Sequence, residues 1–288
     1  MRFRRAAAPL FLACPLLLAP WAARAQEGIP VDQPSALRNL VPAQEIEQSA
    51  NQQYHALLQQ AAAKHALAPD DNPQLKRLRT IVKRLIANAP RYNSRAREWH
   101  WEVNLIGSKQ INAFCMPGGK IAFYTGLVEG MKLSDDEIAI VMGHEMAHAL
   151  REHAREQTAK SQLTQIGASI LGQFIGRGQY NGLIQQGGNL LTLKFSRDDE
   201  SEADLVGLDL AARSGFDPRA GVALWRKMAA QNTSRAGDSL WSKMAGDSIG
   251  GAIMGVTSTH PADESRIAAI EQHLPEVMPL YEQARVKR

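Results

Sequence analysis

Cysteine is scarce in this sequence, and its scarcity excludes a disulfide framework. The chain has 2 cysteines in 288 residues, Cys14 and Cys115. Cys14 lies in an N-terminal stretch that reads as a cleaved export signal, which leaves Cys115 alone in the mature chain. We therefore expect no internal disulfide, and we expect Cys115 to be a buried apolar thiol.

A large excess of charge of one sign is also missing. The whole chain carries a formal net charge of +4, but residues 1–25 contain four arginines and no acidic residue. Removal of that segment leaves the rest of the chain close to neutral. The charge balance therefore gives no support to a nucleic-acid partner.

Long apolar runs are absent after the N-terminal segment, which we predict to be a secretory signal peptide cleaved after Ala25. Its parts are a positive start, an apolar centre and a small-residue cleavage site: Arg2, Arg4 and Arg5, then residues 6–22, then Ala23-Arg24-Ala25. The short length and three prolines disfavour a membrane anchor. Lipid attachment at Cys14 is the other alternative, but Phe11-Leu-Ala13 before it is a poor lipoprotein signal. We expect a soluble or peripheral periplasmic protein.

The stretch that carries recognisable chemistry is His144-Glu145-Met146-Ala147-His148. In a helix, the two histidines lie about 40° apart around the axis, with Glu145 beside them. Two imidazoles one turn apart can hold a zinc ion, and the carboxylate between them can reach a water on that zinc. The sequence therefore predicts a zinc site with Glu145 as its general base.

The residues around this motif favour a buried helix that begins at Ser134. Ser134 and Glu137 have capping-box spacing, and the positions that follow are mainly apolar as far as Leu150. The alternative is a chance match on a helix rich in His and Glu. Polar groups on a buried helix are costly without partners or a metal, which argues against chance.

A third zinc ligand is needed, and a later acidic stretch offers it. A further histidine directly after the motif is excluded, because the required positions hold Arg151 and Ala154. Glu200 and Asp204 are four residues apart on one predicted helix and share a face, so Glu200 can ligate zinc and Asp204 can hold a ligand histidine. The alternative is a solvated acidic helix start. Glu202, which points away from that face, is the next candidate for the ligand.

Three motifs together resemble metallopeptidase family 48, which includes the CAAX prenyl endopeptidases and HtpX-like enzymes. They are Gly143-His-Glu-Met-Ala-His-Ala149, Glu200-Ser-Glu-Ala-Asp-Leu-Val-Gly207 and Thr259-His-Pro-Ala-Asp-Glu-Ser-Arg266. The segment at 112–127 is similar to the family's strand. The resemblance covers roughly residues 45–275 and is closest to the soluble periplasmic beta-barrel assembly-enhancing type. The sequence has no internal repeats, so we expect no tetratricopeptide module.

The resemblance and the patterning together predict an α+β fold, a mainly helical gluzincin-like domain with a small antiparallel sheet beside the zinc helix. We assign residues 1–25 to the signal, 26–42 to an extended linker and 43–288 to the zinc metallopeptidase domain. The predicted elements are helices at 43–66, 73–89, 217–230 and 262–273, the last ending before Pro275, and strands at 98–107, 111–116 and 120–124. Residues 157–194 contain many glycines, which favours broken helices as a mobile cover, a packed helical hairpin or, less well, a membrane-touching loop.

The expected function is that of an exported zinc endopeptidase with one Zn²⁺ per chain. The resemblance implies substrates that are unfolded or misassembled envelope proteins, and outer-membrane assembly machinery as a possible partner. An open strand edge at Asn112, Ala113 and Phe114 would receive a peptide as an added strand. The rival hypothesis is a chaperone or assembly factor for outer-membrane proteins that rarely cuts.

Three further residues gain roles from the resemblance. Asp204 either supports the zinc site, which we favour, or donates a proton. His260 is implied to face the zinc, where it would stabilise the oxyanion or latch the metal until substrate binds. The alternative is that His260 has no catalytic role and only caps a helix or lies on the surface. Arg266 is expected to pair with a carboxylate near the site, such as Asp204.

Overall fold

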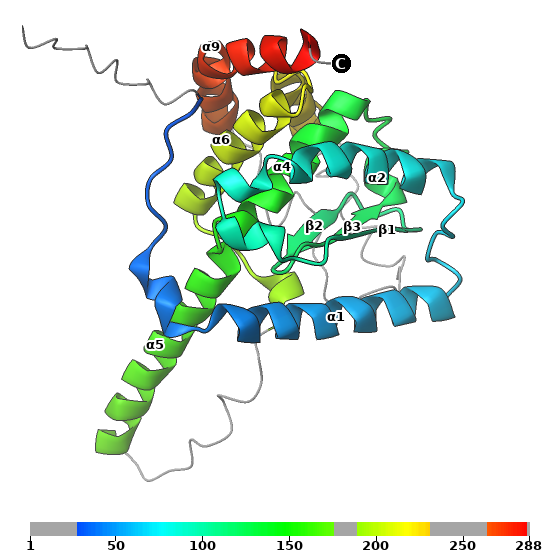
Figure 1. Ribbon diagram of the computed structural model, residues 1–288. Helices are drawn as coiled ribbons and strands as arrows, with labels where there is room; N and C mark the ends of the chain where they lie inside the picture. The colour runs from blue at the N-terminus through cyan, green and yellow to red at the C-terminus, as the bar shows by residue number, and fades with distance from the viewer. Residues whose placement is uncertain (1–27, 176–188, 231–263, 287–288) are drawn as a thin grey trace, which may run out of the picture.

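The computed structural model describes residues 28–175, 189–230 and 264–286 (Figure 1). Helices surround a three-stranded sheet, so the predicted α+β class is confirmed. In chain order the elements, with η for 3-10 helices, are η1 (Ala36–Leu40), α1 (Ala43–Ala63), α2 (Pro73–Ile86), η2 (Ala89–Arg91), η3 (Ser94–Arg97), β1 (Glu102–Ile106), β2 (Ala113–Met116), β3 (Lys120–Tyr124), α3 (Thr125–Val128), α4 (Asp135–Leu150), α5 (His153–Ile175), η4 (Leu190–Thr192), α6 (Arg197–Arg213), a helix at 220–230 and α9 (Glu264–Val286).

The sheet is mixed rather than antiparallel, which corrects the predicted strand directions. Its order is β1-β3-β2, with β1 parallel to β3 and β2 antiparallel to β3. Gly118 and Gly119 have positive φ angles of +84° and +79° and form the tight turn that makes β2 and β3 a hairpin. No such turn joins β1 to β2, and residues 107–112 carry the chain past the position of β3 to the far edge.

Helix α4 runs through the centre of the molecule, and it packs against β2, α2 and α6. It begins as predicted, because Ser134 and Glu137 form a capping box with both hydrogen bonds present. Every residue from Glu137 to Leu150 is buried. The polar residues of the motif are therefore held inside the protein, where each requires a partner.

Helices α4 and α6 cross in backbone contact, and glycine makes that contact possible. A Cβ added to Gly143 would lie 2.7 Å from the backbone oxygen of Gly207, and one added to Gly207 would lie 2.6 Å from the backbone nitrogen of His144. A side chain on either residue would push the helices apart. The close crossing fixes how near the first turns of α6 come to the motif on α4.

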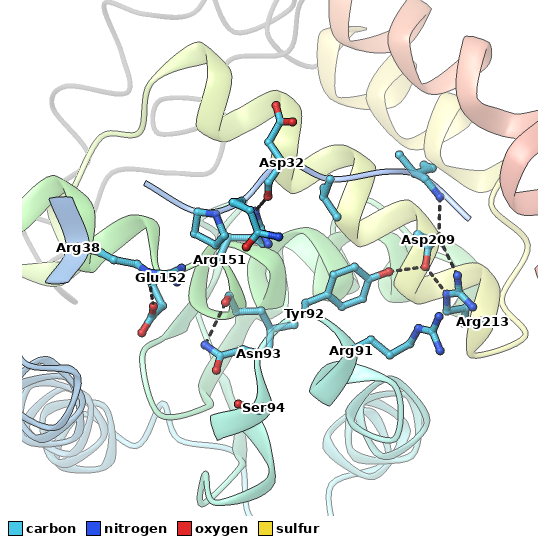
Figure 2. A pocket seen from close by; sticks show the side chains of 15 residues that line it. Asp32, Arg38, Arg91, Tyr92, Asn93, Ser94, Arg151, Glu152, Asp209 and Arg213 are labelled. Carbon is cyan, nitrogen blue, oxygen red and sulfur yellow. Dashed lines mark hydrogen bonds and ion pairs between the residues drawn. The ribbon is translucent and has the colours of Figure 1, made fainter. Parts of the chain in front are cut away.

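The segment before α1 is extended, but it packs on the domain instead of hanging free as a linker. The backbone N–H of Ile29 donates to Asp209 at 3.0 Å, and Ile29 and Val41 are buried. The carbonyl of Asp32 accepts a hydrogen bond from Arg151, as Figure 2 shows. The folded unit therefore includes residues that the sequence pattern assigned to a connection.

Two helices run further than predicted. Helix α9 continues through Pro275 and Pro279, although proline removes a hydrogen bond within a helix, and it changes direction along its length (Figure 1). Burial of Val277, which follows Pro275, and of Leu280, which follows Pro279, stabilises the continuation. Helix α5 is continuous to Ile175, which disagrees with broken helices over 157–175, one of the alternatives considered for 157–194. Within the described part of the chain, no helix has both the length and the apolar character to cross a membrane.

Candidate metal centre

Three buried side chains, His144, His148 and Glu200, meet where α4 crosses α6. The Nε2 atoms of the two histidines are 3.2 Å apart. Glu200 places Oε2 3.5 Å from His144 Nε2 and Oε1 3.6 Å from His148 Nε2. One ligand atom from each residue lies within 4.8 Å of the other two, which is a cluster that a single metal ion can bridge. Two imidazole nitrogens and a carboxylate oxygen form a donor set that suits zinc.

Local structure explains why these three residues meet. His144 and His148 are one helical turn apart on α4, so their rings lie on the same side of that helix. Glu200 lies in the first turn of α6, whose start is fixed by a capping box between Ser196 and Asp199. The glycine crossing described above then brings this turn against the α4 motif. The predicted ligand set therefore lies together, from two segments more than fifty residues apart.

Asp204 holds the outer nitrogen of His144. Its Oδ1 lies 3.0 Å from His144 Nδ1. Burial opposes the ionised form of Asp204, but Arg266 and His144 outweigh burial and lower the pKa of its carboxyl group. Burial by itself also lowers the pKa of His144, but Asp204 and Glu200 outweigh that effect and raise this pKa to about 9. The structure thus favours an ionised Asp204 that orients a ligand.

Arg266 pairs with two carboxylates of α6, Glu200 and Asp204, and the pairing with Asp204 was predicted. Its Nε and Nη2 donate to Asp204 at 2.6 and 2.8 Å, and its Nη1 lies 3.1 Å from Glu200 Oε2. The guanidinium carbon lies 3.9 Å from the ring centre of Trp225. A buried, bidentate arginine of this kind offsets the negative charge that two acidic side chains bring into the interior.

A second network, not predicted from the sequence, lies on the other side of the centre. His148 Nδ1 is 2.9 Å from His153 Nδ1, and His153 Nε2 is 2.8 Å from Glu202 Oε2. The chain makes this contact possible by turning between α4 and α5 at Glu152, which has a φ of +61°. Glu202 does point away from the Glu200 face, as predicted, but it is bonded to His153 and Arg151 rather than merely solvated. The missed signal was a third histidine five residues after the motif.

Glu145 faces a cleft that also reaches the sheet. The cleft is lined by Glu145 and His148 from α4, by Asn112 and Phe114 at the β2 edge, and by apolar residues that include Leu191, Leu193 and Phe195. Phe195 stacks on the His148 ring at 4.1 Å between ring centres. Ala113, the third predicted substrate residue, packs in the hydrophobic core instead. The roles of Asn112, Ala113 and Phe114 in binding a peptide stay predictions.

Some predicted features lie outside the described residues. These are the signal at 1–25 with Cys14, the segment at 176–188 and His260, together with most of the motif that contains it. The two roles considered for His260 therefore stay predictions. Cys115 is described, and it is buried, as expected.

Comparison with known proteins agrees with this geometry. A family model described as Peptidase family M48 matches residues 72–274. The mitochondrial metalloendopeptidase OMA1 of Arabidopsis thaliana is 34% identical over 190 residues, 65% of this chain and 35% of that protein. Metalloprotease LoiP of Escherichia coli is 31% identical over 180 residues, 62% of this chain and 68% of LoiP. The beta-barrel assembly-enhancing protease of Yersinia pestis is 31% identical over 170 residues, 54% of this chain and 32% of that protein.

The matches to these relatives cover only part of each protein's length. This chain spans between 35% and 56% of the length of the OMA1 proteins of Arabidopsis thaliana, Schizosaccharomyces pombe and Saccharomyces cerevisiae. The residues matched by the family model include both the motif helix and the helix that supplies Glu200. On the match to that model over most of its length, and on the similarity to LoiP, the chain belongs to peptidase family M48.

Proposed function

We propose that this protein is a zinc-dependent endopeptidase with its active site at His144, His148 and Glu200. The observation that carries the proposal is the juxtaposition of this metal-binding cluster with Glu145 at the wall of a cleft. The names of several relatives, metalloendopeptidase and metalloprotease, describe the same chemistry. The cleft is also lined by Asn112 and Phe114, at the edge of β2.

Each side chain of the site has a separate role in peptide hydrolysis. His144, His148 and Glu200 would hold a zinc ion, which would supply a Lewis acid to lower the pKa of water and polarise a carbonyl group. Glu145 acts as the general base, which accepts the proton of the attacking water and delivers it to the leaving amine. Asp204 keeps His144 oriented through its Nδ1 contact, and it stays ionised because Arg266 and His144 lower its pKa. An ionised carboxylate accepts hydrogen bonds but cannot donate a proton, which supports the role of Asp204 as a support for His144 over that of a proton donor.

The β2 strand offers a way to hold the substrate. One edge of β2 pairs with β3, and among residues 28–175, 189–230 and 264–286 no strand pairs with its other edge. A peptide that adds there as a strand would form backbone hydrogen bonds independent of its sequence. Recognition through the backbone requires an extended segment, which an unfolded protein provides and a folded one does not. We therefore infer that the substrates are unfolded polypeptides.

The envelope is the compartment that we propose. The N-terminal residues have the pattern of a secretory signal, and two relatives are named metalloprotease LoiP and beta-barrel assembly-enhancing protease. These features support cleavage of unfolded or misassembled envelope proteins in the periplasm, with outer-membrane assembly machinery as a partner. The OMA1 relatives are named as mitochondrial, so the family likeness alone does not select the compartment.

The test compares the wild type with Glu145→Gln on an unfolded protein substrate. We expect the wild type to hold about one zinc per chain and to cut, and Glu145→Gln to hold the same zinc while losing activity by several orders of magnitude. Glu98→Gln, on an exposed residue, is the matched control and should cut as the wild type does. Equal rates for wild type and Glu145→Gln would contradict the mechanism. If the wild type binds unfolded protein but never cuts it, the chaperone hypothesis replaces the enzyme.

A further inference from the structure

We propose that His153 is a positioning residue for the metal ligand His148, and that Glu202 and Arg151 hold His153 in the orientation this role requires. The proposal rests on the metal centre of the proposed function, but it concerns residues outside the ligand set. Its basis is a continuous hydrogen-bonded path from Arg151 through Glu202 and His153 to His148.

The path is short; Arg151, His153 and His148 are buried, and Glu202 is partly exposed. Arg151 Nε donates to Glu202 Oε1 at 2.9 Å, and its Nη2 lies 2.6 Å from the same oxygen. The other carboxylate oxygen of Glu202 is 2.8 Å from His153 Nε2, and His153 Nδ1 is 2.9 Å from His148 Nδ1. His153 has a relative exposure of only 2%. Buried contacts of this length hold a ring in one orientation.

The chemistry of Glu202 sets the direction of every hydrogen bond in the path. An ionised carboxylate only accepts, so the Nε2 atom of a neutral His153 must carry the proton and donate to Glu202. The Nδ1 atom of His153 is then an acceptor, and the proton between the two rings belongs to His148 Nδ1. His148 is left with an unprotonated Nε2, which is the atom that faces His144 and Glu200. The path thus selects the tautomer of His148 that can bind a metal.

Each ligand histidine therefore has its own outer support. His144 is held by Asp204 directly, at 3.0 Å. His148 is held by Glu202 through one intervening imidazole. Both carboxylates belong to α6, and an arginine fixes each one: Arg266 for Asp204 and Arg151 for Glu202. Two arginine–carboxylate pairs thus control the two ligand rings.

The far end of the path is anchored to the N-terminal segment. Arg151 Nη2 also donates to the backbone oxygen of Asp32, and Figure 2 shows this contact at the crossing of the segment over the end of α4. Arg151 has a relative exposure of 6%. A buried guanidinium with partners on both sides has little freedom to release Glu202.

The competing explanation is a purely structural network that fastens the α4–α5 turn to α6. Both explanations predict some loss of thermal stability when His153 is replaced. Only the positioning role predicts a loss of metal affinity that depends on hydrogen-bonding capacity at position 153 rather than on bulk. Zinc affinity is therefore the readout, measured by chelator competition on the purified full chain.

Two variants separate bulk from hydrogen bonding. His153→Leu fills space but neither accepts nor donates, and we expect its zinc affinity to fall about 10- to 100-fold. His153→Gln offers one acceptor and two donors on its amide, and we expect it to recover part of that loss. Wild-type zinc affinity in His153→Leu would overturn the proposal, as would equal losses in the Leu and Gln variants.

A double-mutant cycle tests the path itself. Glu202→Ala should also lower zinc affinity, but it should add little in a chain that already carries His153→Leu, because it acts through His153. Fully additive losses would mean that Glu202 does not act through His153. If His153→Leu fails to fold, wild-type zinc affinity in Glu202→Ala alone overturns the proposal.

The matched control is Glu137→Gln, which changes another buried carboxylate with a cationic partner, Lys227, outside the path. It should lower the melting temperature without changing zinc affinity. The proposal can fail without the proposed function. If the wild type binds no zinc, the metal centre itself is wrong. If the wild type binds zinc and cuts while His153→Leu is unchanged, only the positioning role is wrong.

Discussion

At the scale of single residues, the site separates two buried carboxylates by their surroundings. Asp204 and Glu145 are both buried, with relative exposures of 6% and 3%. Arg266 and His144 saturate Asp204 with donors and lower its pKa, which suits a fixed support. Glu145 instead lines the cleft where a substrate would lie. The surroundings of the two carboxylates, rather than their residue types, therefore distinguish Glu145 as the general base from Asp204 as the support.

Arg266 is the residue whose loss we expect to affect the fold most in this region. Arg266→Met would leave Glu200 and Asp204 as neighbouring buried charges, and breaking a buried pair by removing one partner costs about 3–5 kcal/mol. The free energy of unfolding, measured in urea with a chelator present, should fall by about that amount. The exposed pair of Arg219 with Asp217 is the control. Arg219→Met should change stability little, and an equally small effect of Arg266→Met would contradict the prediction.

At the scale of secondary-structure elements, the crossing of α4 and α6 determines the ligand geometry. Gly207→Ala would place a methyl group 2.6 Å from the backbone of His144, too close for the helices to keep their separation. We expect a loss of about 1–3 kcal/mol in stability together with weaker zinc binding. Denaturant unfolding and chelator competition measure the two effects. Gly221→Ala is the matched control, since its nearest contact would be an ordinary 3.5 Å. Normal zinc affinity in Gly207→Ala would show that the crossing does not set the site.

Glu137, at the start of α4, should make the stability of the protein depend on pH in the acidic range. Burial raises the pKa of Glu137, but hydrogen bonds from Lys227 and Ser134 outweigh burial and lower this pKa below its ordinary value. A lowered pKa means that Glu137 contributes stability above about pH 4.5 and that this contribution is lost as pH falls through the folded-state pKa. Glu137→Gln should therefore cost about 1 kcal/mol at pH 7. The difference from wild type should disappear as the pH falls below that folded-state pKa, as measured by urea unfolding. A difference independent of pH would contradict the assignment.

At the scale of the whole molecule, the N-terminal segment acts as part of the fold. A cavity of about 540 Å³ lies beside the segment, between it and the body of the protein, so close packing alone does not hold it there. Figure 2 shows Tyr92 and Arg213 bonded to Asp209. The backbone N–H of Ile29 donates to the same carboxylate and attaches the segment. One buried carboxylate therefore connects the segment, the η2 region and α6.

Replacement of Asp209 should release this segment. In Asp209→Ala, the backbone amides of residues 28–42 should exchange with deuterium faster than in the wild type, because Ile29 loses its acceptor. Hydrogen exchange followed by mass spectrometry of the N-terminal peptides measures this directly. Asp135→Ala, on a carboxylate whose side chain is 62% exposed, should leave the exchange unchanged. Unchanged protection in Asp209→Ala would show that the segment is held elsewhere.

The sequence by itself determined the features that depend on one or two helical turns. The spacing of His144, Glu145 and His148 fixes their common sector on α4, and the Ser134 cap fixes where that helix begins. The four-residue spacing of Glu200 and Asp204 likewise placed both on one face of α6. These relations follow from backbone geometry, which is the same in every helix.

Only the tertiary structure decided the features that join distant residues. The parallel pairing of β1 with β3, the course of α9 through Pro275 and the bond from Ile29 to Asp209, 180 residues away, have no local signature. The same holds for His153, whose role depends on Glu202, 49 residues further along the chain. Such contacts arise because burial of apolar surface outweighs local preference. The metal ligands can therefore be predicted from the sequence, but the residues that hold their side chains in place are determined by tertiary packing.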